Sequence, residues 1–194
     1  LHDGVEPQLS LELFGQKLSV PVILGAVAGV KTNRLDDCIT EENLLNSWLE
    51  GAKIGETLGM TGDGPDPSLY AIAIEASKKY PGVAIPIIKP RPQEEILTRI
   101  KEAEEAGAVA VGVDIDAAAL IHNVKGLTCQ PKTLDQIQKL VESTHLPLVL
   151  KGIMTVEDAV AAYHAGVKAI VVSNHGGRAL DHCPGTAEVL PEIA

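Results

Sequence analysis

The chain has 194 residues, a length that suits one domain. Its formal net charge of −10 argues against a nucleic-acid surface, because phosphate binding requires clustered lysine and arginine side chains. No apolar run reaches membrane-spanning length, and Cys38, Cys129 and Cys183 show neither disulfide nor metal spacing. We therefore expect a cytoplasmic protein without a metal, a nucleic-acid partner or a membrane partner.

Short apolar segments alternate with helical patterns along the chain. The segments predicted to be strands are residues 20–24, 57–60, 83–88, 109–113, 146–150 and 169–172. The helical patterns between them cover residues 41–51, 67–79, 93–106, 133–143 and 156–165. This alternation predicts βαβ units and a parallel sheet.

An internal repeat supports the same architecture. Residues 105–111 and 164–170 share a pattern in which a glycine ends a helix and an apolar strand follows, and residues 50–55 form a weaker copy. Recurrent units of this kind predict an α/β fold, a partial TIM (β/α)8 barrel spanning residues 1–194 as one incomplete domain. About six βα units are expected, with the last two missing. A doubly wound open sheet is the competing fold, but the Gly-x-Gly-x-x-Gly fingerprint is absent.

Polar residues follow the predicted strands, at the edge where barrels bind ligands. Residues 173–178 read Ser-Asn-His-Gly-Gly-Arg and follow an apolar strand. His175 can accept a proton near neutral pH, and Arg178 can grip a carboxylate with two hydrogen bonds. Structural interpretations remain open, since a lone histidine is often a loop residue and residues 61–67 can form a simple tight turn. The other polar residues at predicted strand ends are Lys89, Asp114, Asp116 and Lys151.

Four segments carry a family resemblance, namely residues 146–153 (LPLVLKGI), 157–159, 165–166 and 173–178. Together they resemble the FMN-dependent α-hydroxy-acid oxidase and dehydrogenase family, whose members include glycolate oxidase and lactate oxidase. The chain looks most like the short bacterial α-hydroxy-acid oxidising proteins, with truncation at both ends. The resemblance is specific from about residue 146 to residue 193 and looser before it. It implies a (β/α)8 barrel with FMN across the strand ends.

The resemblance also implies catalytic roles for four residues. His175 matches the general base that removes the proton from the substrate hydroxyl, while hydride passes to flavin N5. Arg178 matches the residue that binds the substrate carboxylate. Lys151 matches the lysine beside flavin N1 and O2, where a cation stabilises the reduced ring. Asp116 aligns with the aspartate that orients the imidazole.

Further cofactor and substrate contacts follow from the same alignment. Asp114 falls where the family usually has a flavin-contacting threonine. Lys89 joins His175 and Arg178 as an expected substrate-binding residue. The expected cofactor-binding residues are Ala26, Val27, Ala28, Thr61, Asp114, Lys151, Ser173 and Gly176.

Departures from the family pattern leave other functions open. Pro86 and Ile88 stand where typical members have a flavin-binding glutamine and a substrate-binding tyrosine, and Ala179 replaces a common glutamine. The leading hypothesis is an enzyme that oxidises a small 2-hydroxy acid to a 2-oxo acid. The alternatives are a non-redox FMN or phosphate-binding barrel enzyme, similar to the type 2 isopentenyl diphosphate isomerase, and an inactive fragment or binding module. Family members often form tetramers, which makes a homo-oligomer an expectation of the resemblance.

Overall fold

A single parallel sheet organises the chain, as the βα repeat predicts. The computed structural model describes residue 4, residues 6–123 and residues 128–194. Six strands lie in the order β3–β4–β5–β6–β7–β8, and each neighbouring pair is parallel. Their bounds are β3 (Leu24–Val27), β4 (Gly59–Thr61), β5 (Ala84–Ile88), β6 (Val111–Asp114), β7 (Leu148–Ile153) and β8 (Ala169–Val172). A sheet whose spatial order equals its sequence order is what consecutive right-handed βα units produce, and it confirms the predicted α/β class.

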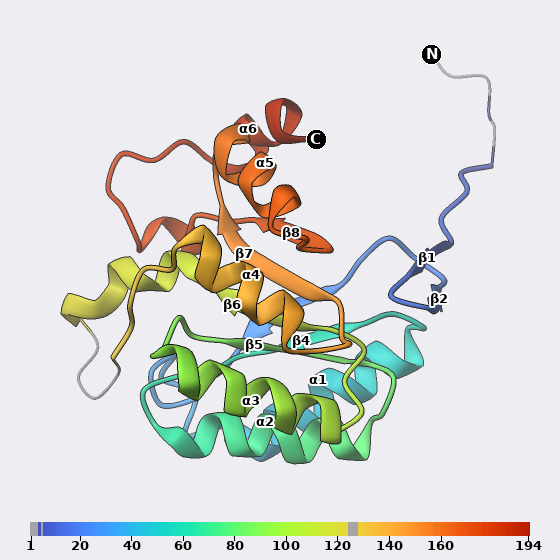
Figure 1. Cartoon of the computed structure of the whole chain (residues 1–194). Coiled ribbons are helices and arrows are strands. Elements are labelled where there is room, and N and C mark those ends of the chain that lie inside the picture. The colour runs from blue at the N-terminus through green and yellow to red at the C-terminus, as the bar shows by residue number, and fades with distance from the viewer. Residues whose placement is uncertain (1–3, 5, 124–127) are drawn as a thin grey trace.

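Helices follow the strands in turn and lie around the outside of the curved sheet (Figure 1). They are α1 (Glu41–Ile54), α2 (Pro67–Lys79), α3 (Gln93–Glu105), α4 (Leu134–Glu142), α5 (Val156–His164) and α6 (Thr186–Ile193). Threonines begin three of them, because the hydroxyls of Thr40, Thr133 and Thr155 each accept a hydrogen bond from a free amide of the first turn. Within the described residues, every helix is too short or too polar to traverse a bilayer.

Two short 3-10 helices carry the chain away from the sheet at the carboxyl ends of strands. The helix η1 (Ile115–Asn123) follows β6, and η2 (His175–Gly177) follows β8. Both lie at the same end of the molecule, on the left of Figure 1. The residues that sequence analysis places at strand ends are therefore delivered to one edge.

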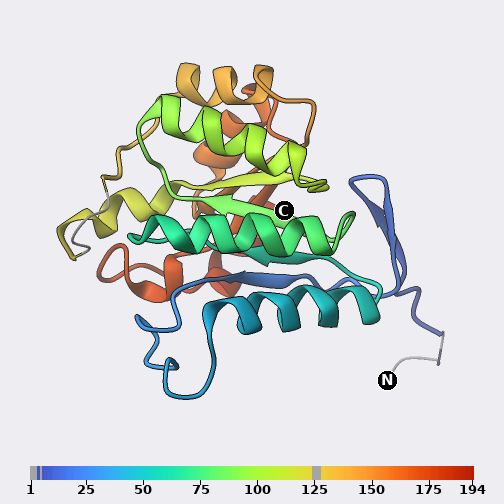
Figure 2. The same ribbon diagram turned by 90° about the horizontal axis from the view of Figure 1, so that it is seen from below.

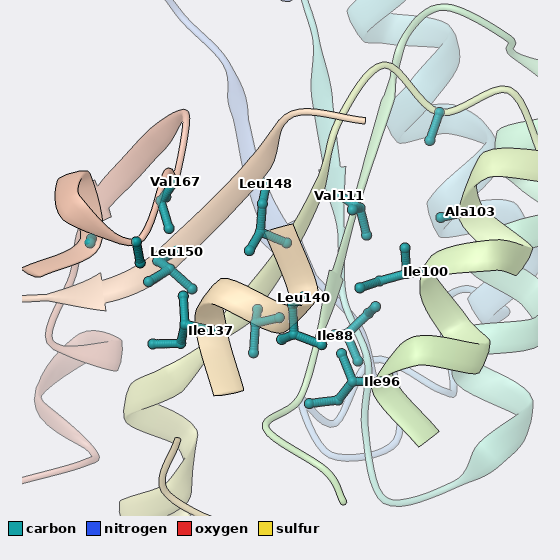
Figure 3. Close-up of a cluster of buried hydrophobic side chains, with 14 of the residues drawn as sticks. Ile88, Ile96, Ile100, Ala103, Val111, Ile137, Leu140, Leu148, Leu150 and Val167 are labelled. Atoms are coloured by element: carbon teal, nitrogen blue, oxygen red, sulfur yellow. The ribbon is translucent and has the colours of Figure 1, made fainter. Parts of the chain in front are cut away.

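The main hydrophobic core lies between the sheet and the helices α3 and α4 (Figure 3). Aliphatic side chains from the strands pack against one face of each helix, and most of them are excluded from solvent. Close packing of this kind fixes the strands in register and so fixes the positions of their ends. The side chains that meet there include Ile88, Ile96, Ile100, Val111, Ile137, Leu140, Leu148 and Leu150.

An antiparallel hairpin, which the sequence analysis did not predict, precedes the sheet. It consists of β1 (Leu11–Leu13) and β2 (Gln16–Leu18), joined through Phe14 and Gly15 in left-handed conformations. Figure 2 shows it beyond one end of the sheet, away from η1 and η2. Its apolar side chains pack against strand residues on the inner face, so it covers the end opposite the candidate site.

The first strand of the sheet lies further along the chain than predicted. The apolar run favours residues 20–24, but β3 covers Leu24–Val27. Pairing of Leu24 with Gly59 and of Val27 with Thr61 sets this register. Pro21 lacks the amide proton that a ladder needs, which is consistent with a strand that starts after it. Ala26 and Val27 are thus strand residues.

Candidate functional site

A cavity of about 530 Å³ lies at the carboxyl ends of the strands. Its volume falls within the range of small-molecule sites, roughly 300 to 1,000 Å³. Most residues that sequence analysis placed in a site line it: Ala26, Val27, Ala28, Lys89, Asp114, Lys151, Ser173, His175, Gly176 and Arg178. Asp116 lies behind His175, outside the lining. Thr61 is fully buried beside the lining residue Gly62, and its hydroxyl has no hydrogen-bond partner in the described part of the chain.

Asp114 joins two lysines at the floor of this cavity. One carboxylate oxygen accepts from Lys89 Nζ at 2.6 Å, and the other accepts from Lys151 Nζ at 2.8 Å. Lys89 follows β5, Asp114 ends β6, and Lys151 lies within β7 directly opposite Asp114, which brings the three side chains together. Burial would raise the pKa of Asp114, but hydrogen bonding by His175 and the charges of Lys89 and Lys151 hold it well below its ordinary value. The carboxylate is therefore ionised at neutral pH.

His175 is held by a second carboxylate. Its Nδ1 lies 2.9 Å from Asp116 Oδ1 and 3.5 Å from Asp114 Oδ2. The shorter contact carries the hydrogen bond, in which Nδ1–H donates to Asp116. That tautomer leaves Nε2 with a lone pair, which is what a general base requires.

The two aspartates and the imidazole influence one another's titration. Asp114 and Asp116 raise the pKa of His175 above its ordinary value, because both carboxylates favour the protonated ring. Burial raises the pKa of Asp116, and the nearby negative charge of Asp114 adds to this. The site thus stabilises the imidazolium that forms when His175 takes a proton.

Gly152 allows Asp116 to approach β7. A Cβ atom on Gly152 would lie 2.6 Å from Asp116 Cγ and 2.8 Å from its backbone nitrogen, and the residue has a φ of +106°. Only glycine meets both conditions without strain. In the sequence, Gly152 is visible only as the glycine that follows Lys151 in an apolar strand. That pattern does not reveal that Asp116 packs against it.

The turn after β8 is built from left-handed residues. His175, Gly176 and Gly177 have φ values of 57°, 67° and 72°. A left-handed conformation is uncommon for histidine and is a form of strain found at functional sites. Arg178 Nε donates to the backbone oxygen of His175 at 3.0 Å, so the turn also holds the arginine at the cavity.

A buried charge network behind the cavity was missed by sequence reasoning. Asp63 accepts hydrogen bonds from Arg91 at 2.8 Å and 3.0 Å, and its carboxylate lies 2.9 Å from Arg99. It also accepts from the backbone amides of Gly64 and Lys89. Residues 61–67 therefore do more than form a tight turn, because Asp63 ties the loop after β4 to the loop after β5.

The loop after β3 is fastened in a similar way. The buried carboxylate of Glu41 accepts from the backbone amide of Gly29, at 2.8 and 3.0 Å, and from that of Val30 at 2.8 Å. The Asn33 side chain donates to the backbone oxygens of Ala28 and Gly29. These contacts hold the backbone wall of the cavity, which presents small side chains to a ligand.

The polar side chains of this site are better suited to an organic cofactor with an electron-rich edge than to a metal ion. Side-chain atoms of Asp114, Asp116 and His175 lie within 4.8 Å of one another, a spacing that would allow a cation. However, the Asp114 carboxylate already accepts from two ammonium groups. Ala26, Val27 and Ala28 line the cavity with aliphatic side chains that would leave room for a flat ring, and Lys151 also lines it and could hold an electron-rich edge.

Comparison with known families places this site in context. A family model described as FMN-dependent dehydrogenase matches residues 121–194. L-lactate oxidase of Lactobacillus jensenii is 52% identical over 58 residues, which is 30% of this chain and 14% of that protein. 2-Hydroxyacid oxidase 1 of Mus musculus is 28% identical over 238 residues, covering 100% of this chain and 61% of the relative. The chain thus spans less than two thirds of the length of these relatives.

Solved structures share the fold over nearly the whole chain. A mandelate oxidase variant with an FMN adduct superposes with a TM-score of 0.69 at 25% identity, covering 96% of this chain and 58% of that one. A flavocytochrome b2 variant superposes with a TM-score of 0.74 at 25% identity, covering 96% and 49%. The six-stranded sheet corresponds to part of the barrel of these enzymes, as predicted. Residues 121–194 thus match the FMN-dependent dehydrogenase model, and the whole chain is similar in sequence and fold to part of a 2-hydroxyacid oxidase, a mandelate oxidase and a flavocytochrome b2.

Proposed function

We propose that the protein containing this chain binds FMN and oxidises a small 2-hydroxy acid to the corresponding 2-oxo acid. The observation that carries the proposal is the convergence of His175, Lys151 and Arg178 on one cavity at the strand ends. Lys151 comes from β7, whereas His175 and Arg178 come from the turn after β8, and together they supply a base and two cations. The names of the similar proteins, lactate oxidase and 2-hydroxyacid oxidase, agree with this chemistry.

Each residue has a distinct task in the proposed reaction. Arg178 binds the substrate carboxylate through parallel N–H groups, which fixes the α-carbon relative to the base. His175 accepts the hydroxyl proton at Nε2. Asp116 keeps the proton on Nδ1 and stabilises the charged ring, in the same manner as the aspartate of a catalytic triad.

When bound, FMN would supply the redox chemistry, as an acceptor for hydride from the substrate α-carbon. Lys151 lines the cavity and would hold the ring with a fixed positive charge, which would stabilise negative charge on it. The main-chain wall at Ala26, Val27 and Ala28 accommodates the ring, and Thr61, Asp114, Ser173 and Gly176 remain proposed contacts to it. Lys89 is proposed to contact the substrate side of the cavity.

The redox reading is favoured over a non-redox barrel enzyme acting on a diphosphate. The match to the FMN-dependent dehydrogenase model includes the segment that holds His175 and Arg178. A base beside a carboxylate-binding arginine serves a hydroxy acid directly. A diphosphate, in contrast, calls for several cations or backbone amides that face phosphate oxygens.

A screen of substrates tests the proposal. The complete protein is reconstituted with FMN, mixed anaerobically with a panel of 2-hydroxy acids, and followed by the loss of flavin absorbance. We expect at least one acid to bleach the flavin. Arg178→Met should lower kcat/KM for that acid about 100-fold, because two charge-assisted hydrogen bonds are lost.

The same screen can contradict the proposal in two ways. Bleaching by none of the acids, with FMN demonstrably bound, would reject 2-hydroxy-acid oxidation. Equal kcat/KM values for the parent protein and Arg178→Met would reject the role assigned to Arg178. Isopentenyl diphosphate serves as the comparison ligand, because the non-redox alternative predicts turnover of it without lasting bleaching.

A further inference from the structure

The Asp114 carboxylate contacts three charged or titratable side chains of the cavity. It lies 2.6 Å from Lys89 Nζ, 2.8 Å from Lys151 Nζ and 3.5 Å from His175 Nδ1. Its side chain is 5% exposed, so water screens these charges weakly. Asp114 therefore links the base of the proposed reaction to both lysines of the cavity.

The imidazole consequently faces two carboxylates rather than one. Asp116 holds Nδ1 by the shorter contact of 2.9 Å, while its second oxygen is buried without a hydrogen-bond partner among the described residues. Asp114, the last residue of β6, approaches the same nitrogen two residues before Asp116 in the chain. At this distance Asp114 stabilises the protonated ring as a second, longer hydrogen-bond partner of Nδ1 and by its negative charge.

We propose that Asp114 is a positioning residue that makes His175 a stronger base, and that Lys89 moderates this effect by sharing the Asp114 carboxylate. The inference rests on the proposed function, in which His175 accepts the substrate proton. In this proposal Lys89 lines the cavity and also affects the basicity of His175 through its ion pair with Asp114.

Charged side chains from several neighbouring elements affect the protonation of His175. The anions favour the imidazolium, and the cations oppose it. Asp63 lies in the same cavity wall, but Arg91 and Arg99 compensate its charge. The groups that face or adjoin the ring are Lys89 after β5, Asp114 on β6, Asp116 on η1, Lys151 on β7 and Arg178 after η2.

Two substitutions should move the titration of His175 in opposite directions. Asp114→Asn removes an anion close to Nδ1 and should lower the pKa of His175 by about one unit. Lys89→Met removes a cation and frees one Asp114 oxygen, so it should raise the pKa of His175. The double variant should fall between the two single variants.

Histidine-specific NMR titration of the complete protein without added FMN measures these shifts directly. The chain contains six histidines, and the signal of His175 is assigned by its loss in His175→Gln. Asp66→Asn makes the same chemical change at the exposed N-cap of α2, next in the chain to the lining residue Pro65, and should leave the titration unchanged. If Asp114→Asn does not fold, the upward shift in Lys89→Met tests the proposal by itself.

The outcomes separate this inference from the proposed function. Opposite shifts support the role of Asp114 even if no 2-hydroxy acid is oxidised. Shifts in the same direction, or no shift in either foldable variant, reject it even if oxidation occurs. In an active enzyme, the acid limb of the pH dependence of flavin reduction should move with the NMR value, whereas a purely structural role would change only stability.

Discussion

Among single residues, Gly152 sets how closely Asp116 can approach the end of β7. A methyl group in its place would overlap Asp116 and would also be strained at a φ of +106°. We predict that Gly152→Ala displaces the Asp116 carboxylate from His175 and slows anaerobic flavin reduction about 100-fold, the lower end of general-base effects. Stopped-flow absorbance measures the rate.

A second glycine provides the control for this prediction. Gly51 lies inside α1, and a Cβ atom on it would meet nothing within 4 Å. Gly51→Ala should therefore keep the full rate of flavin reduction. Full activity in Gly152→Ala as well would show that contact between Asp116 and His175 does not depend on this close approach.

Several site residues were predictable from the sequence because they follow strands directly. Lys151, His175 and Arg178 stand next to apolar runs, and the structure places all three at one cavity. The partners of Asp63 could not be predicted in the same way. Arg91 lies in a loop and Arg99 in a helix, and no spacing within the sequence reveals that both meet the carboxylate of Asp63.

Between elements, the network around Asp63 ties β4, β5 and α3 together. The side chains of Asp63, Arg91 and Arg99 are 0%, 6% and 9% exposed. Asp63→Ala would leave two buried guanidinium groups without this carboxylate. We predict a loss of about 3 to 5 kcal/mol in the free energy of unfolding, measured by urea denaturation.

An exposed ion pair gives the matched comparison. Lys78 pairs with Glu75 on α2, but both side chains are largely exposed. Lys78→Ala should leave the free energy of unfolding almost unchanged, because water and salt screen an exposed pair. A loss below about 1 kcal/mol in Asp63→Ala would contradict the structural role assigned to the buried network.

The sequence predicted a helix correctly where its apolar residues recurred at helical spacing over several turns. The helix over residues 67–79 agrees at both ends with α2, since a proline begins it and its apolar spacing continues. The hairpin β1–β2 escaped prediction because each strand has only three residues. The helix η1 follows β6 without a break, and its alanine-rich sequence gave no starting signal. Pairing with β4, rather than hydropathy, determines the position of β3.

For the molecule as a whole, the consecutive order of the strands accounts for the site. Each βα unit adds one strand end to the same edge, so residues between Ala26 and Arg178 gather at one cavity. The repeat pattern predicted this arrangement, and the similar structures share it over 96% of the chain. Side-chain pairing across strands, such as Lys89 with Asp114, depends on register and curvature that the repeat does not encode.

The rate of anaerobic flavin reduction in His175→Gln tests the central claim most directly. The complete protein and the variant are both loaded with FMN and mixed with the best 2-hydroxy acid from the substrate screen. Removal of the base should slow reduction by a factor on the order of 10³ while FMN stays bound. Equal rates in the two proteins would mean that the cavity at the strand ends does not use His175 to oxidise the acid.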